Sequence, residues 1–172
     1  ATAPGSRCGA GSVTISATPN SGTIKWYDTA TGGTLLFTGN SYTTPSIAIT
    51  TIYYAEAYNG CTASSRTAVT ATINSIPTIT GNTASRCDAG TVTISANPST
   101  GTVTWYDAPT GGTLLSTGTV YTTPSINTST TYYAETTSAQ GCISARIPVV
   151  ATVNTTPTVT STTPASRCGG GS

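Results

Sequence analysis

The sequence repeats itself with a period of about eighty residues, and this period constrains the fold more than any other feature. Trp-Tyr-Asp at 26–28 recurs at 105–107, and Tyr-Tyr-Ala-Glu at 53–56 recurs at 132–135. A segment of this length forms one small domain. We therefore expect a first domain at 1–75, a second at 76–155, and a linker with the first residues of a third repeat at 156–172.

A third Ser-Arg-Cys motif near the end of the chain supports the expectation of a further repeat. Ser-Arg-Cys occurs at 6–8, at 85–87 and again at 166–168. Repeat arrays normally continue through several copies, so we expect the chain to end as a third repeat begins. The alternative is a glycine–serine tail added artificially after residue 168.

The hydrophobic pattern within one repeat has the period of a β-strand. Val13, Ile15 and Ala17 alternate with Thr14 and Ser16, which predicts a strand with one buried face. Similar short segments follow at 24–27, 35–37, 42–47, 52–58 and 67–73, separated by glycine, proline and asparagine. About seven short strands with a tryptophan on an inner strand predict an all-β fold of tandem immunoglobulin-like sandwiches.

The charge content excludes several classes of partner. Only 6% of the residues are charged and the net charge is +1. A protein that binds nucleic acid or an anionic surface needs a basic field, which this chain lacks. The sequence has no apolar run long enough to cross a bilayer, so we expect no membrane insertion by this segment.

The cysteine positions suggest disulfides in an oxidising compartment. Cys8 with Cys61, and Cys87 with Cys142, give one pair at matching positions in each repeat, and Cys168 lacks a partner because its repeat is truncated. A small domain gains stability from such a bond. In the usual sandwich the two positions lie at opposite ends, so the bond requires the Cys8 segment to run back along the sandwich.

The shared motifs resemble a known family. Ser-Arg-Cys-Gly, Val-Thr-Ile-Ser-Ala, Trp-Tyr-Asp, Gly-Gly-Thr-Leu-Leu and Gly-Cys are similar to the Ig-like tandem repeats of Bacteroidetes surface proteins. These proteins include the large adhesins of gliding bacteria that are exported by type IX secretion. The resemblance implies a secreted protein at the cell surface and a role in cell adhesion.

We expect no enzyme activity, no cofactor and no metal site. The chain contains no histidine, which excludes a histidine-based triad. Asp28 with Glu56, and Asp107 with Glu135, are carboxylate pairs of the kind that glycosidases use. Because the same residues recur in every repeat, we interpret them as turn and strand residues of a scaffold.

Two surface features are candidates for ligands or modification. Thr29 follows an aspartate and precedes an alanine, which resembles the O-glycosylation acceptor of Bacteroidetes. Exposed aromatic rings can stack on sugars. The tyrosines that we expect to face solvent on adjoining strands are Tyr27, Tyr54, Tyr58, Tyr106 and Tyr133. The alternative is cross-strand pairing that only stabilises the sheet.

We therefore expect a structural spacer in an extracellular adhesin or filament, a semi-rigid rod that projects an adhesive tip. Its partners are the neighbouring repeats of the same chain, and its low charge permits lateral self-association. The first alternative is a module that binds carbohydrate, for example surface polysaccharide. The second is an accessory domain of a secreted enzyme that degrades polysaccharide.

Overall fold

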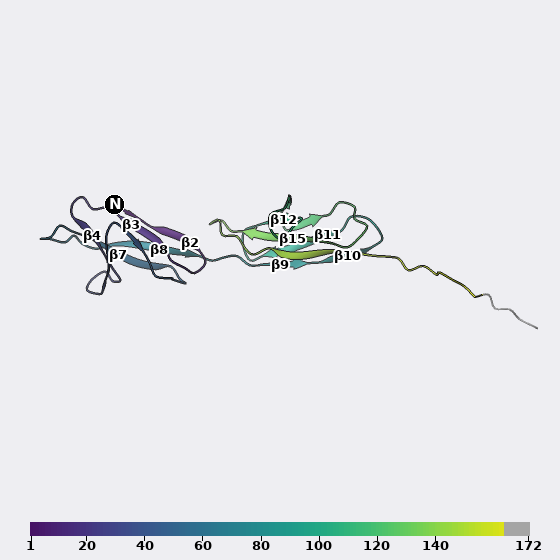
Figure 1. The fold of residues 1–172 in the computed structure, drawn as a ribbon, viewed down its shortest axis with the longest axis horizontal. Coiled ribbons are helices and arrows are strands. Elements are labelled where there is room, and N and C mark those ends of the chain that lie inside the picture. The colour runs from purple at the N-terminus through teal and green to yellow at the C-terminus, as the bar shows by residue number, and fades with distance from the viewer. Residues whose placement is uncertain (164–172) are drawn as a thin grey trace, which may run out of the picture. The chain divides into compact units, whose positions relative to one another are not determined.

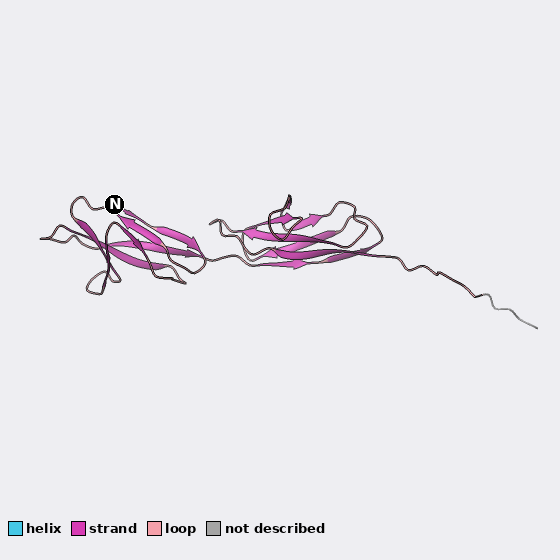
Figure 2. Cartoon of the chain, in the orientation of Figure 1, coloured by secondary structure: helices cyan, strands magenta, loops and turns pink. Residues whose placement is uncertain are grey.

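The computed structural model describes residues 1–163, and within them all regular structure is β-strand (Figures 1 and 2). Residue 168 and the rest of its Ser-Arg-Cys motif lie outside the described residues, so the expected third repeat and the state of Cys168 stay predictions. The all-β architecture predicted from the hydrophobic pattern is confirmed.

Each repeat contains eight strands in the same order. The first repeat is built from β1 (Thr2–Ala3), β2 (Gly5–Cys8), β3 (Thr14–Ala17), β4 (Thr23–Tyr27), β5 (Leu35–Thr38), β6 (Ser41–Thr43), β7 (Thr51–Tyr58) and β8 (Thr67–Asn74). The second is built from β9 (Ile79–Asn82), β10 (Ala84–Cys87), β11 (Thr93–Pro98), β12 (Thr102–Tyr106), β13 (Leu114–Thr117), β14 (Val120–Thr122), β15 (Thr130–Thr137) and β16 (Ile147–Asn154).

In each repeat the strands form two facing sheets. The first repeat has a sheet of order β1-β3-β6 and a larger sheet of order β2-β8-β7-β4-β5. The second repeat has the corresponding sheets β9-β11-β14 and β10-β16-β15-β12-β13. The pairs β2 with β8 and β10 with β16 are parallel, whereas neighbouring pairs such as β7 with β8 and β15 with β16 are antiparallel. This arrangement is a tandem of Ig-like sandwiches.

A tryptophan occupies the centre of each sandwich. Trp26 and Trp105 are both 0% exposed, and each indole Nε1 donates a hydrogen bond of 2.8 Å to a backbone carbonyl, that of Gly39 or Gly118. The alternating residues predicted to point inward, such as Ile15 and its equivalents, surround the indole. Buried indoles need a partner for their N–H group, and the repeat provides the same one twice.

The start of each repeat differs from the strand pattern read from the sequence. The first segment splits at Pro4 into β1, which joins the small sheet, and β2, which joins the large one. Neither strand shows a clean hydrophobic alternation, because both are short strands at the edges of their sheets with largely exposed side chains. The chain consequently switches sheets before the first strand that the sequence pattern predicts.

The chain divides into two compact units whose limits do not coincide with the repeats. The first unit comprises 1–78 together with 99–101 and 136–145, and the second comprises 79–98, 102–135 and the described residues from 146 onward. Two loops that belong to the second repeat by sequence are therefore part of the unit that contains the first repeat.

Candidate functional site

The two ends of each repeat carry its cysteines. We call one end the head: in the first repeat it holds the chain start, the turn at 18–22 and the loop at 59–66, because Thr23 pairs with Tyr58. We call the opposite end the tail: it holds Cys8 at the end of β2 and Asn74 at the end of β8, which are register partners. The second repeat has the same two ends.

The structure contradicts the predicted pairing of cysteines within each repeat. Cys8 is bonded to Cys142, with 5.5 Å between their Cα atoms. Cys61 and Cys87 are exposed and have no disulfide partner among residues 1–163. The predicted Cys8–Cys61 and Cys87–Cys142 bonds are therefore wrong.

Cys8 cannot bond to Cys61 because the length of one strand separates them. Cys8 lies at the tail of the first repeat and Cys61 lies at its head, so the eight residues of β8 separate them. At about 3.3 Å per residue this strand spans about 26 Å. A disulfide needs Cα atoms within about 7 Å of each other. The β2 strand runs parallel to β8 and carries Cys8 away from the head.

An arginine folds the loop that follows each tail cysteine. Arg7 donates a hydrogen bond of 3.2 Å to the carbonyl of Ser12, and its guanidinium covers the Cα of Gly11. Arg86 bonds in the same way to the carbonyl of Thr91, at 3.1 Å. Gly11 has φ 149°, a backbone conformation that favours glycine, and a Cβ at this position would also displace the Arg7 guanidinium.

The residue after each tail cysteine has a left-handed backbone. Gly9 has φ 69° and Asp88 has φ 60°. Aspartate tolerates this conformation better than most residues. The Asp88 carboxylate accepts bonds from the hydroxyl and backbone N–H of Thr156, at 2.7 and 3.2 Å. These two bonds lower the pKa of Asp88 below 3.8, and they hold the segment that follows the repeat against its tail.

The heads of the two repeats differ in exposure. In the second repeat Thr136, Ser138, Cys142 and Ser144 are all buried, and Cys142 is 0% exposed. In the first repeat the corresponding loop, 59–65, is exposed throughout. The loop at 136–145 belongs to the compact unit that contains Cys8, and its buried side chains include the cysteine that is bonded to Cys8.

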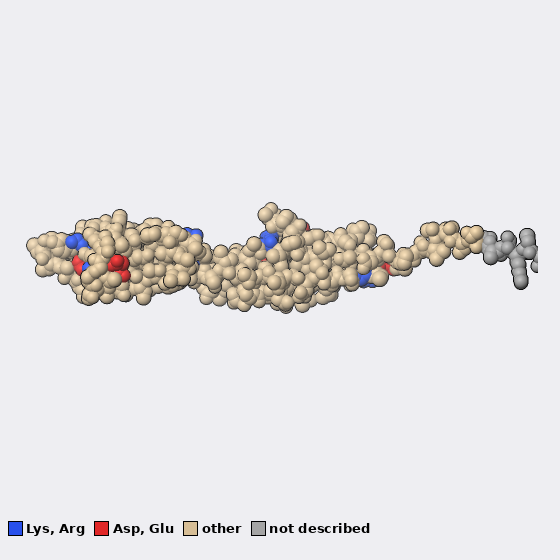
Figure 3. Space-filling model, turned by 90° about the horizontal axis from the view of Figure 1, so that it is seen from below, with Lys and Arg blue, Asp and Glu red and all other residues tan. Residues whose placement is uncertain are grey.

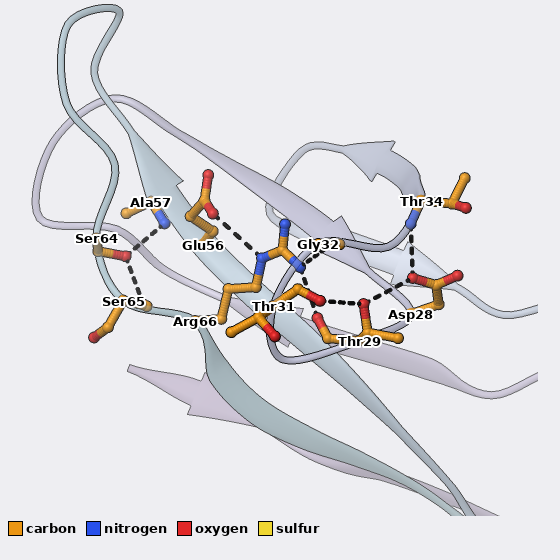
Figure 4. Close-up of polar contacts among 10 residues, drawn as sticks. All are labelled: Asp28, Thr29, Thr31, Gly32, Thr34, Glu56, Ala57, Ser64, Ser65 and Arg66. Atoms are coloured by element: carbon orange, nitrogen blue, oxygen red, sulfur yellow. Dashed lines mark hydrogen bonds and ion pairs between the residues drawn. The ribbon is translucent and has the colours of Figure 1, made fainter.

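A second cluster of polar residues lies around Arg66 (Figure 4). Its Nε is 3.3 Å from the Glu56 carboxylate, and its Nη1 donates to the carbonyls of Thr29 and Gly32 at 2.7 and 2.6 Å. The guanidinium lies 3.4 Å from the centre of the Tyr27 ring. Arg66 therefore ties the 28–34 loop to the large sheet.

The second repeat reproduces this cluster. Arg146 binds Glu135 at 2.8 Å, bonds to the carbonyls of Ala108 and Gly111, and covers Tyr106 at 3.4 Å. The contact at this position is to a backbone carbonyl in both repeats, Thr29 in the first and Ala108 in the second, so the cluster does not need the threonine side chain. Its recurrence is typical of a scaffold.

The acidic residues singled out as carboxylate pairs have structural partners. Asp28 accepts a 2.8 Å bond from the N–H of Thr34, which closes its loop and lowers the pKa of the Asp28 carboxyl. Asp107 accepts a 2.7 Å bond from Thr113 in the same way. Glu56 and Glu135 face the arginines instead. Each of these four carboxylates therefore has a backbone N–H or an arginine as its partner, and these contacts hold loops in place.

The tyrosines expected to face solvent are all half-buried: Tyr27, Tyr54, Tyr58, Tyr106 and Tyr133. Arginine covers one face of Tyr27 and one face of Tyr106, and Lys25 Nζ lies 3.6 Å from the centre of the Tyr58 ring. Three of the five rings therefore form cation–π pairs, and Tyr27 is the cross-strand register partner of Tyr54. The five rings are half-buried rather than fully exposed, and their role as a sugar-binding surface stays a prediction.

Thr29 is exposed in the 28–34 loop, and its hydroxyl donates a 3.1 Å bond to the carbonyl of Thr31. Its glycosylation stays a prediction. Within residues 1–163 no group of three histidine, cysteine, aspartate or glutamate side chains could hold a metal ion. No helix in the described part of the chain could span a membrane. Figure 3 shows few charged side chains, in small separate groups.

The comparisons with known proteins place the chain among Ig-like domains. The profile of a family described as "Ig-like domain CHU_C associated" matches residues 1–74 and again residues 75–157. No curated protein sequence matches the chain.

Solved structures with the same fold have low sequence identity. A titin I-band fragment, I67–I69, has a TM-score of 0.51 at 14% identity; the match covers 90% of this chain and 64% of that chain. The fibronectin(III)-like modules of Clostridium thermocellum CbhA have a TM-score of 0.48 at 14% identity, with 89% and 90% of the two chains covered. The titin match shows the fold alone.

Proposed function

Because the chain belongs to the family of CHU_C-associated Ig-like domains, in two tandem copies, we propose that it is a structural spacer of an extracellular surface adhesin. In this proposal its partners are neighbouring repeats, and its task is to hold an adhesive part of the protein away from the cell. It performs no reaction and needs no cofactor.

The observation that carries this proposal is the Cys8–Cys142 disulfide. The bond ties the tail of one repeat to the head loop of the next, so the joint between consecutive repeats is covalent in addition to the peptide linker. A binding module has no need of such a bond, whereas a spacer that transmits force through its joints gains from it. The linker residue Pro77 is buried, which also restricts movement of the linker.

The disulfide also supports an extracellular location. Structural disulfides form and persist in secreted proteins and are rare in reducing compartments. The resemblance to surface repeats of Bacteroidetes extends the proposal to the adhesins of gliding bacteria and to type IX secretion.

Direct sugar binding is the less favoured alternative. It requires free aromatic faces, and one face of each of Tyr27, Tyr58 and Tyr106 is covered by a cation. Tyr54 and Tyr133 are half-buried within the ladder between the long strands. The aromatic row therefore contributes to sheet stability in a way that accounts for its presence in both repeats.

Replacement of the segment in the full-length protein tests the spacer function. Residues 1–155 are exchanged for an unrelated pair of Ig domains of equal length, and attachment of cells to a surface is measured. We expect attachment to be retained, because a spacer contributes length and stiffness. The contradicting result is loss of attachment together with saturable binding of the isolated chain to a glycan, abolished by Tyr54→Ala.

A further inference from the structure

The tail cysteines of the two repeats occupy the same position. Cys8 is the register partner of Asn74 at the end of the parallel β2–β8 pair, and Cys87 is the register partner of Asn154 in the β10–β16 pair. In both, the following residue donates its backbone N–H to that asparagine's carbonyl, at 2.9 and 2.8 Å. Each tail therefore presents a sulfur atom from the same backbone geometry.

The head cysteines lie in the same loop, one residue apart in register. In the first repeat the N–H of Asn59 bonds to the carbonyl of Thr62, and in the second the N–H of Ser138 bonds to the carbonyl of Cys142. Cys61 thus stands one position before the structural equivalent of Cys142. Both cysteines follow a glycine at the tip of the hairpin, at the end of the repeat opposite to the tail cysteine.

Among residues 1–163, the disulfide joins the tail of the first repeat to the head of the second, and the other head and tail differ from these in exposure. Cys8 is half-buried and bonded, whereas Cys87 in the same setting is exposed. Cys142 is fully buried, whereas Cys61 is exposed. The two cysteines without a disulfide partner among residues 1–163 are therefore also the two exposed ones.

The open head is also hollow. Two adjoining depressions of about 260 Å³ each lie at this end of the first repeat, and they share Asn20, Ala57 and Ser64. The residues that correspond to Ala57 and Ser64 in the second repeat are Thr136 and Ser144, both buried. Side chains that are covered in one repeat therefore line an open surface in the other.

We propose that the head of the first repeat is a docking site for the tail of another copy of this repeat, and that Cys61 forms a disulfide with its Ser-Arg-Cys cysteine. Cys87 forms the corresponding bond with the head cysteine of the repeat that follows. For the isolated chain the occupant is a second copy of the chain, whose Cys87 bonds to Cys61. Every joint in an array then carries the bond seen between Cys8 and Cys142.

This contact is heterologous, because the tail of one molecule meets the head of the next. Such a contact leaves one head and one tail free at every stage, so it generates an open chain of molecules. The lining of the two depressions contains no charged side chain. The exposed tail of the second repeat carries both Arg86 and Asp88, so repulsion between like charges does not oppose docking.

The bond forms by thiol–disulfide exchange with a small-molecule disulfide. The Cys87 thiolate attacks one sulfur of that disulfide, which forms a mixed disulfide and releases one thiol. The Cys61 thiolate of the docked copy then attacks the Cys87 sulfur and releases the second thiol. Two protein thiols are oxidised to one disulfide, and one small disulfide is reduced to two thiols.

Oxidation of the purified chain tests the proposal. All proteins carry Cys168→Ser, so that Cys61 and Cys87 are the two remaining thiols. The chain is held at about 1 mM, the range of effective concentration that a short tether would provide, in a buffer of reduced and oxidised glutathione. Products are separated without reduction. Linked peptides are then identified after cleavage with trypsin and a glutamate-specific protease, which isolates Cys61 in 57–66 and Cys87 in 87–135.

We expect a ladder of oligomers in which Cys61–Cys87 linkages exceed each symmetric linkage at least about twentyfold, which is tenfold above the statistical ratio of two and corresponds to a docking preference of about 1.4 kcal/mol. Cys61→Ser alone and Cys87→Ser alone serve as matched controls and form no ladder. An equimolar mixture of the two variants forms dimers and nothing longer, because each molecule then has one usable end.

Two results would overturn the proposal. One is symmetric Cys61–Cys61 and Cys87–Cys87 linkages at the statistical ratio to the mixed linkage. The other is the absence of any Cys61–Cys87 bond in a buffer where the Cys8–Cys142 bond re-forms after complete reduction. Either result leaves the spacer function standing, and glycan binding would remove the spacer function without affecting this linkage.

Discussion

The two repeats have equivalent interiors and different ends, and this contrast shows which features belong to the fold and which belong to the array. Trp26 and Trp105 are equally buried and make the same hydrogen bond. The head loop is exposed throughout in the first repeat, whereas in the second Ser138, Ser144 and the bonded Cys142 are buried. The two repeats therefore have the same environment around the tryptophan and different environments at the head loop.

Removal of the disulfide is expected to have the largest effect. Cys8→Ser opens a loop with a sequence separation of 134 residues, which the chain-entropy model equates with about 5 kcal/mol of unfolding free energy for the two repeats together. Thermal and denaturant unfolding of the oxidised proteins measure this loss. Cys87→Ser is the matched control, because its thiol occupies the same position without a partner, and its stability should equal that of the parent. An equal loss in both variants would break the contrast between the two tails.

Truncation of either buried indole is expected to cost nearly as much. Trp26→Ala and Trp105→Ala each leave a cavity and an unpaired backbone carbonyl, and each should lower the stability of its own repeat by about 3–5 kcal/mol. The measurement uses the Cys8→Ser background, where circular dichroism follows the damaged repeat and the remaining tryptophan reports on the intact one. Losses that differ by more than about 1 kcal/mol would show that the interiors are not equivalent.

Loss of the guanidinium clusters is expected to have an intermediate effect. Arg66→Ala and Arg146→Ala each remove a largely buried ion pair, two carbonyl contacts and a cation–π contact, so each should cost about 2 kcal/mol. Denaturant unfolding of the two variants provides the comparison. A near-zero cost in either repeat would mean that the 28–34 loop or its equivalent holds its position without the arginine.

Lowering the pH is expected to affect the tail of the second repeat and not that of the first, and this is the smallest of the expected effects. The folded-state pKa of Asp88 lies below 3.8, so its bonds to Thr156 stabilise the tail above that pH and are lost as pH falls through the lower folded value. Gly9 has no carboxylate at this position. The amide resonance of Thr156 should therefore titrate with Asp88, while that of the equivalent Ile76 stays constant. A parallel shift at residue 76 would contradict this difference.

The strand pattern of the sequence was sufficient to predict the sandwich but not its first strands. The alternation at Val13, Ile15 and Ala17 predicts a buried face, and all three side chains are buried. The segments at 2–8 and 79–87 lack this alternation because they form short strands at sheet edges. Hydrophobic periodicity records burial, so it cannot locate a strand whose side chains are mostly exposed.

The cysteine pairing could not be deduced from spacing. In a tandem repeat, equal spacing fits a bond within each repeat and a bond between consecutive repeats equally well. The signal that separates them is position along β8, which places Cys8 and Cys61 at opposite ends. The cation–π partners of the tyrosines could not be predicted from the sequence either, because Arg66 reaches Tyr27 only after β4, β7 and β8 have paired.

Disulfide mapping of the natively purified chain tests the central claim most directly. Free thiols are blocked before cleavage with trypsin and a glutamate-specific protease, which separates Cys8 (8–25), Cys61 (57–66), Cys87 (87–135) and Cys142 (136–146). The structure predicts that peptide 8–25 is linked to 136–146 in the monomer, with blocked thiols in 57–66 and 87–135. Linkage of 8–25 to 57–66 and of 87–135 to 136–146 would contradict the covalent joint between repeats and the spacer function inferred from it.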